Sequence, residues 1–121
     1  MSFVFIHTGY LRHPKLVGLP AGAVLLHLAS ILWTAEHLTD GYVPESALTE
    51  LGHTVNNASR WHRRNVQQLV NRGLWDELPN GWHVHDFEDW NRSSTREVVE
   101  ANRTAARDRQ RRHRDSESRR D

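Results

Sequence analysis

Apolar residues recur at helical spacing in two segments of the chain. Between Ala21 and Leu38 they fall three and four positions apart, and Thr39-Asp40-Gly41 follows as a stop signal. Between Asn57 and Asn71 one face is apolar and the opposite face carries Arg, Gln and Asn, with Gly73 as a C-terminal stop. The pattern predicts a helix in each segment, and the second helix is amphipathic.

Shorter patterns predict the elements around these two helices. Phe3–His7 is rich in β-prone residues and predicts a first strand. Leu11–Leu19 has a proline near its start, where the first turn of a short helix accepts it. Gly41–Pro44 predicts a short extended piece, and Glu45–Leu51 predicts a further helix with an acid in its first turn.

A β-hairpin is predicted after the second long helix. Leu74–Leu78 predicts a strand, and Trp82–His85, in which Trp82 and Val84 alternate with His83 and His85, predicts the return strand. Pro79-Asn80-Gly81 between them is a turn of hairpin type. Asp86–Trp90 is expected to leave the sheet.

The order of these elements predicts a mostly α fold with a small antiparallel β-sheet. A helical pair joined by a short turn and followed by a hairpin is the winged helix-turn-helix order. We assign residues 1–91 to this domain and residues 92–121 to a basic tail. Ser94 and Glu97 form a capping box, so the tail is expected to begin as a helix and to end in a disordered, Arg-rich segment.

Basic and acidic residues are concentrated in different segments of the chain. The net charge is only +1. However, residues 54–72 contain four Arg and no acid, residues 73–91 contain five acids and no Lys or Arg, and residues 92–121 contain ten Arg and six acids. Two separate basic segments of this kind are typical of nucleic-acid binding.

Composition narrows the class of protein. The chain contains no cysteine, which excludes disulfides and thiolate metal sites and suits a reducing interior. The N-terminus has no basic segment followed by a long apolar run, so it does not resemble a signal peptide. The longest apolar stretch, Ala21–Trp33, is too short and too interrupted to span a bilayer. We therefore expect a cytoplasmic protein without membrane contact.

The Asn57–Asn71 helix is the candidate recognition helix. Arg suits phosphate contacts and bidentate reading of guanine, and Asn and Gln pair with adenine edges. Because the N-terminal part of the second helix reads bases in helix-turn-helix proteins, the predicted DNA-binding residues lie there. They are Thr54, Asn56, Asn57, Ser59, Arg60, Arg63, Arg64 and Gln67. Auxiliary, sequence-independent phosphate contacts are predicted for Arg103, Arg107, Arg111 and Arg112 of the tail.

The predicted hairpin carries Asp76 and Glu77 and no Lys or Arg, so phosphates are expected to repel it. Its DNA contacts would be limited to the tip, and its acidic side could instead face a protein partner. In the second strand, His83 and His85 alternate and could share a metal ion. The alternative is two exposed histidines flanking a buried Val84. No third ligand has recognisable spacing, so we predict no metal site.

Enzymatic motifs are missing from the sequence. Gly18 and Gly22 match neither the phosphate-binding loop nor the dinucleotide fingerprint, and no nucleophile elbow occurs. The acids Asp86, Glu88 and Asp89 are expected to form a solvated turn rather than a nuclease metal site. We therefore expect a non-enzymatic protein without a cofactor.

Several segments resemble one family of proteins. They are Thr8–Lys15, the end of the Leu-rich helix at Ala35–Gly41, Trp82–Phe87 and Asn91–Ser93. They resemble small winged-helix proteins of actinobacterial phages and prophages. These proteins are similar to the N-terminal DNA-binding domain of phage replication initiators, also called replisome organisers. The resemblance covers roughly residues 3–112. Longer initiators carry a further domain that recruits a helicase or its loader, whereas this sequence stops at Asp121, so the resemblance implies DNA binding more than a complete initiator.

The sequence thus predicts a sequence-specific protein that binds double-stranded DNA and acts in replication initiation or transcriptional regulation. The alternative is a protein–protein interaction module that docks on a host or phage protein of the replication or transcription machinery. A monomer and a homodimer both remain open. Phe87 and Trp90 could supply a dimer interface, although we expect them to cap the domain's own core.

Overall fold

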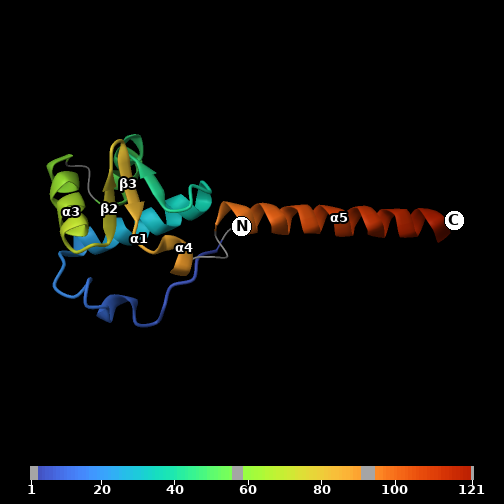
Figure 1. The fold of residues 1–121 in the computed structure, drawn as a ribbon, viewed down its shortest axis with the longest axis horizontal. Helices are drawn as coiled ribbons and strands as arrows, with labels where there is room; N and C mark the ends of the chain where they lie inside the picture. Colours follow the sequence, from blue (N-terminus) through green and yellow to red (C-terminus); the bar gives the residue numbers. More distant parts are fainter. Residues whose placement is uncertain (1–2, 56–58, 91–94, 121) are drawn as a thin grey trace.

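Helices and one small sheet make up the computed structural model, which describes residues 3–55, 59–90 and 95–120 (Figure 1). The α-helices are α1 (Ala21–Glu36), α2 (Leu48–Val55), α3 (Ser59–Asn71), α4 (Phe87–Trp90) and α5 (Arg96–Arg120). The strands are β1 (Tyr42–Pro44), β2 (Trp75–Leu78) and β3 (Gly81–Val84), and the short 3-10 helices are η1 (Tyr10–Arg12) and η2 (Glu45–Ala47). The predicted class, mostly α with a small antiparallel sheet, is confirmed. No helix among the described residues is long and apolar enough to cross a membrane.

Helix α1 forms the centre of the fold, with α2, α3 and the sheet packed against it. Its small residues Ala23, Ser30 and Thr34 are fully buried, which lets these neighbours approach closely. The Ser30 hydroxyl donates to the carbonyl of His27 at 2.6 Å, and the Thr34 hydroxyl donates to the carbonyl of Ser30 at 2.8 Å. These bonds give each hydroxyl hydrogen an acceptor within the helix.

The sheet is antiparallel in the order β1-β3-β2, so β3 is its central strand. Val43 lies opposite Trp82, and Trp75 lies opposite Val84. Trp75 is 1% exposed, and its indole N–H donates to the Ser30 hydroxyl at 3.1 Å. This bond connects the hairpin to α1. The predicted hairpin is confirmed, with strand ends shifted by one residue.

The N-terminal segment differs from its prediction. Residues 3–7 belong to no strand, and the segment Leu11–Leu19 forms η1 and turns rather than a helix. Phe3 and Phe5 are 74% and 71% exposed, so the apolar pattern there reflects no burial in a sheet. Pro14 lacks the backbone N–H that a continuing helix uses, and Gly18 adopts a positive φ of 84° that a helix does not contain.

The residues that follow β3 first pack into the core and then lead to α5. Phe87 is 1% exposed and belongs to the core cluster, as expected for a residue that caps its own domain. The side chain of Trp90 lies outside the described residues, as does Ser94 of the predicted capping box. The cap observed at the start of α5 comes from elsewhere, because the backbone N–H of Arg96 donates to a carboxylate oxygen of Asp40 at 2.7 Å.

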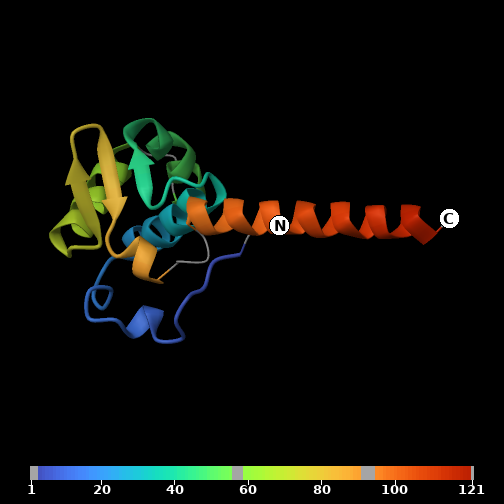
Figure 2. The same ribbon diagram turned by 45° about the vertical axis from the view of Figure 1, so that its right-hand side comes forward.

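Helix α5 is longer than predicted. It is helical from Arg96 to Arg120, where the sequence predicted a disordered end. The ion pairs Arg96–Glu100 at 2.9 Å and His113–Glu117 at 3.0 Å connect successive turns and support a helix that has no apolar face. Figures 1 and 2 both show α5 extending away from the body of the molecule.

We predict that Gly41→Ala destabilises the fold by about 3 kcal/mol, measured by urea denaturation. Gly41 has a φ of 89°, and an added Cβ would lie 2.7 Å from the Cβ of the buried Phe87. Gly18→Ala is the matched control, because its φ is 84° but its nearest contact is the Arg72 Nη2 at 3.4 Å. Gly18→Ala should lower the free energy of unfolding only by the cost of placing alanine at a positive φ, about 1 kcal/mol. Equal losses in both variants would contradict close packing between Gly41 and Phe87.

Candidate nucleic-acid interface

The outward face of α3 carries the exposed side chains of Arg63, Arg64 and Gln67. Positions three and four residues apart lie on the same side of a helix, so Gln67 adjoins both Arg64 and Arg63 on one surface. Asn65, Val66 and Leu69 point the other way and are buried in the body of the protein. The burial of that inner face fixes which side of α3 solvent can reach.

The structure describes only part of the predicted DNA-binding set. Thr54 belongs to α2, and Ser59 and Arg60 belong to the first turn of α3, but their side chains lie outside the described residues. Asn56 and Asn57 also lie outside the described residues. The described interface therefore rests on Arg63, Arg64 and Gln67.

These side chains are available for an external partner. In the described parts of the chain, no carboxylate forms an ion pair with Arg63 or Arg64. The amide of Gln67 donates to the amide oxygen of Asn71 at 2.8 Å, one turn further along the same face. The face thus presents two cationic guanidinium groups beside a pair of amides, which are the groups that contact phosphates and base edges.

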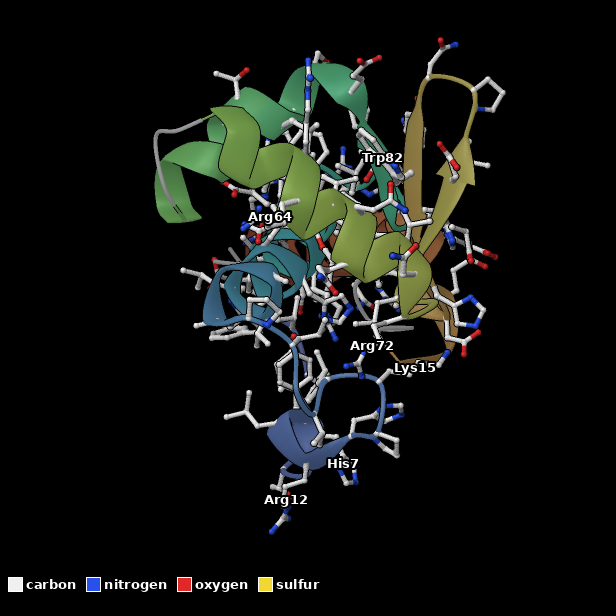
Figure 3. All side chains as sticks on the ribbon, turned by 90° about the vertical axis from the view of Figure 1, so that its left-hand side faces the viewer. His7, Arg12, Lys15, Arg64, Arg72 and Trp82 are labelled. Atoms are coloured by element: carbon white, nitrogen blue, oxygen red, sulfur yellow. The ribbon has the colours of Figure 1, made fainter. Side chains whose placement is uncertain are left out.

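Two other cations of the chain have a structural role instead. The Arg72 guanidinium donates to the carbonyl of Val17 at 2.9 Å and lies 3.4 Å from the carbonyl of Pro14. The Lys15 ammonium lies 3.4 Å from the carbonyl of Gly73. Both side chains lie between the N-terminal segment and the end of α3 (Figure 3). These contacts join residues 55 to 58 positions apart, and no local sequence signal identifies them.

The β2–β3 hairpin presents its acids to solvent. Asp76 and Glu77 are exposed, and the His85 Nδ1–H donates to the Asp76 carboxylate at 2.9 Å. His83 instead donates from Nε2 to the carbonyl of Asp40 at 3.0 Å. The two histidines therefore contact different partners. No group of three His, Cys, Asp or Glu side chains that could hold a metal ion is found within the described residues.

The predicted auxiliary arginines lie on two sides of α5, and all of them are exposed. Arg103, Arg107 and Arg111 are spaced by four residues and share one face, on which each step advances about 6 Å along the axis. Arg114 extends that face, whereas Arg112 lies on the opposite one. Arg111 is also paired with Asp108 at 3.0 Å. The structure thus brings three of the four predicted side chains together.

A partly buried polar pair lies away from α3. The Tyr10 hydroxyl and the Nδ1 of His27 are 2.6 Å apart, and the two rings stack with centroids 5.6 Å apart. Burial lowers the pKa of His27 to about 4, and the positive charge of His13 adds to this effect. Burial raises the pKa of Tyr10 to about 12. At neutral pH the phenol is protonated and the imidazole is neutral, and we assign the phenol as the donor to Nδ1.

We predict that acid destabilises the protein through His27. An unfolded histidine binds its proton near pH 6.5, whereas the folded pKa of His27 is about 4. The unfolded state therefore holds the extra proton between these values, and the free energy of unfolding falls by about 3 kcal/mol as the pH decreases from 6.5 to 4. Urea denaturation across this range should show a smaller fall for His27→Gln than for His113→Gln, an exposed control. Parallel curves for the two variants would exclude this role of His27.

Comparison with protein families, with curated proteins and with solved structures gave no match. The functional assignment of this surface therefore rests on its residues and their arrangement.

Proposed function

We propose that this chain is a sequence-specific protein of the winged helix-turn-helix type that binds double-stranded DNA, with α3 as its recognition helix. The observation that carries the proposal is the exposed face of α3, where Arg63 and Arg64 lie beside Gln67 without a described acidic partner. The sequence from His53 to Gly73 contains no acid, so nothing within that segment opposes the approach of phosphates.

The arrangement of elements supports this proposal. Helices α2 and α3 follow one another, separated by residues 56–58, and both pack on α1. The β2–β3 hairpin follows α3 directly and is completed by β1 as a third strand. This is the element order of winged helix-turn-helix proteins, in which the second helix of the pair enters the major groove.

The chemistry of α3 suits reading of base edges in that groove. An Arg guanidinium can form two parallel hydrogen bonds with guanine, and a Gln amide can do so with adenine. The hydrogen bond from Gln67 to Asn71 orients the Gln67 amide before any base is contacted. Arg63 and Arg64 would divide between base and phosphate contacts.

The other two charged surfaces have secondary roles in the proposal. The acids Asp76 and Glu77 keep the hairpin away from phosphates, so the hairpin acts as a support for α3. The face of α5 with Arg103, Arg107 and Arg111 would neutralise phosphates without reading sequence. Because α5 extends away from the body (Figure 2), these contacts would lie outside the segment of DNA covered by α3.

The resemblance to phage replication initiators favours a cytoplasmic role in replication initiation or transcriptional regulation. The competing function is protein–protein interaction through the hairpin, where the exposed acids Asp76 and Glu77 adjoin Leu78, which is 41% exposed. Such a surface would suit a basic partner protein. The α3 variants below distinguish the two functions, because they alter a different face.

We predict that Arg63→Ala combined with Arg64→Ala weakens duplex binding at least about 30-fold, since each such contact contributes roughly 1–3 kcal/mol. Fluorescence anisotropy with one random duplex and one from the neighbouring genomic sequence measures this loss over a salt series. Both residues are exposed, so thermal stability should change by less than about 0.5 kcal/mol.

Arg63→Ala and Arg64→Ala are also made singly, and Arg12→Ala is the matched control for each of them. Arg12 is exposed and points away from the body at the tip of the N-terminal segment (Figure 3). Its DNA affinity should equal that of the unmodified chain. Equal losses for Arg12→Ala and Arg64→Ala would mean that binding follows total charge rather than α3. If neither duplex binds at low salt, DNA binding is wrong and the hairpin becomes the surface to test.

A separate prediction concerns α5. Arg103→Ala combined with Arg107→Ala should weaken binding to both duplexes by the same factor. It should also reduce the slope of log affinity against log salt by about 1.8, since each phosphate contact contributes about 0.9. Arg112→Ala, on the opposite face, should leave the slope unchanged. A preferential loss on the genomic duplex would contradict a role limited to phosphates.

A further inference from the structure

A cavity of about 180 Å³ lies between the N-terminal segment and the body of the protein. On the body side its lining includes the buried residues Ile31, Val84 and Phe87. On the other side it is lined by residues of the segment from Phe5 to Leu16. A mostly apolar space, partly open to solvent, therefore lies between the N-terminal segment and the body of the protein.

The size of the cavity limits what it can hold. An apolar cavity of about 150 Å³ is large enough for a benzene molecule. The cavity here can therefore hold one six-membered ring with a small substituent. A mostly apolar lining with a few converging polar groups is the usual composition of small-molecule sites.

The polar groups of the lining favour an anionic substituent. The Lys15 ammonium has three donors and makes one long contact, 3.4 Å from the carbonyl of Gly73. His7 and His13 also line the cavity. The one carboxylate of the lining, Asp86, lies 3.4 Å from the Nε2 of His85. Lys15 is the one Lys or Arg of the lining, and among the described residues it forms no ion pair with a carboxylate.

The Tyr10–His27 pair supplies a neutral donor to the same cavity. Both residues line it, and His27 is only 6% exposed. With the Tyr10 hydroxyl donating to Nδ1, the ring proton of the neutral imidazole is on Nε2. A carboxylate or hydroxyl oxygen of a ligand could accept that hydrogen.

We propose that this cavity binds a small monocyclic aromatic acid, with its ring against Ile31, Val84 and Phe87 and its carboxylate towards Lys15 and His27.

The cavity is directly connected to the end of α3. Leu74, the third residue after α3, lines the cavity, and Lys15 contacts the carbonyl of Gly73 just before it. Arg72 holds the same N-terminal segment at Pro14 and Val17. A carboxylate that engages Lys15 competes with the Gly73 carbonyl and loosens this attachment of α3. If α3 binds DNA as proposed above, the ligand therefore weakens DNA binding.

The test uses benzoate as the probe, titrated into the full chain and followed by amide NMR shifts. We expect a dissociation constant of about 1 mM or tighter, with shifts at Tyr10, Leu16 and Leu74. Benzyl alcohol, the neutral counterpart of similar size, should bind about 10-fold more weakly. Lys15→Met should weaken benzoate binding about 10-fold and leave benzyl alcohol binding unchanged. Arg12→Met, in the same segment, is the control and should change neither.

A variant that fills the cavity provides a second measurement. Ile31→Phe should abolish shifts from both probes while the remaining spectrum stays that of a folded protein. If Ile31→Phe does not fold, the comparison of Lys15→Met with Arg12→Met decides alone. The proposal is overturned if benzoate produces no shifts at the cavity up to about 20 mM. It is also overturned if Lys15→Met and Arg12→Met bind equally, or if benzyl alcohol binds as tightly as benzoate.

The connection to DNA binding is tested separately by repeating the anisotropy measurement with saturating benzoate. We expect weaker duplex binding by the unmodified chain when benzoate is present. Lys15→Met, which lacks the contact with the Gly73 carbonyl, should bind the duplex equally weakly with and without benzoate. Benzoate binding at the cavity by a chain that binds no DNA would support the ligand site and refute the proposed function. DNA binding without benzoate shifts would refute the ligand site alone.

Discussion

The packing of Trp75 against α1 holds the sheet, and with it α3, on the central helix. Its indole N–H donates to the Ser30 hydroxyl at 3.1 Å, and that hydroxyl donates in turn to the carbonyl of His27. A large aromatic ring can lie this deep because α1 offers small residues on that side and the indole finds a polar partner there. The contact connects the sheet to the central helix. It also sets the position of α3, since only three residues separate α3 from Trp75.

The end of α3 is a second point at which distant parts of the chain meet. Arg72 and Lys15 attach it to the N-terminal segment, whose described residues before α1 form η1 and turns and no strand. Lys15 also lines the cavity. The N-terminal segment is thus joined by side-chain hydrogen bonds to the end of the helix that carries Arg63 and Arg64. The Asp40 carboxylate has a comparable role for α5, since it caps the helix from 56 positions away.

Much of the fold and part of the candidate site follow from local patterns. The helical spacing of apolar residues in α1 and α3, and the Pro-Asn-Gly turn of the hairpin, identify those elements correctly because each signal lies within its own element. The exposure of Arg63, Arg64 and Gln67 follows from the same spacing. The predicted strand at Phe3–His7 is wrong because a strand also needs a partner edge, which a sequence pattern does not supply. The disordered end predicted for α5 also differs from the structure, where ion pairs between turns support a helix without a core.

Local sequence patterns are sufficient to identify α1 and α3 as helices, the apolar face of α3, and the segments in which basic and acidic groups concentrate. These properties depend on residues within one or two turns of each other. Tertiary packing determines that Arg72 and Lys15 bond to backbone carbonyls of distant residues, whereas Arg63 and Arg64 stay exposed, although all four side chains carry the same charge. It also determines that His83 and His85 contact different partners, and that Tyr10 and His27 meet beside a cavity. The physical reason is that these contacts form between residues brought together by packing on α1, and no local periodicity specifies which distant groups will meet.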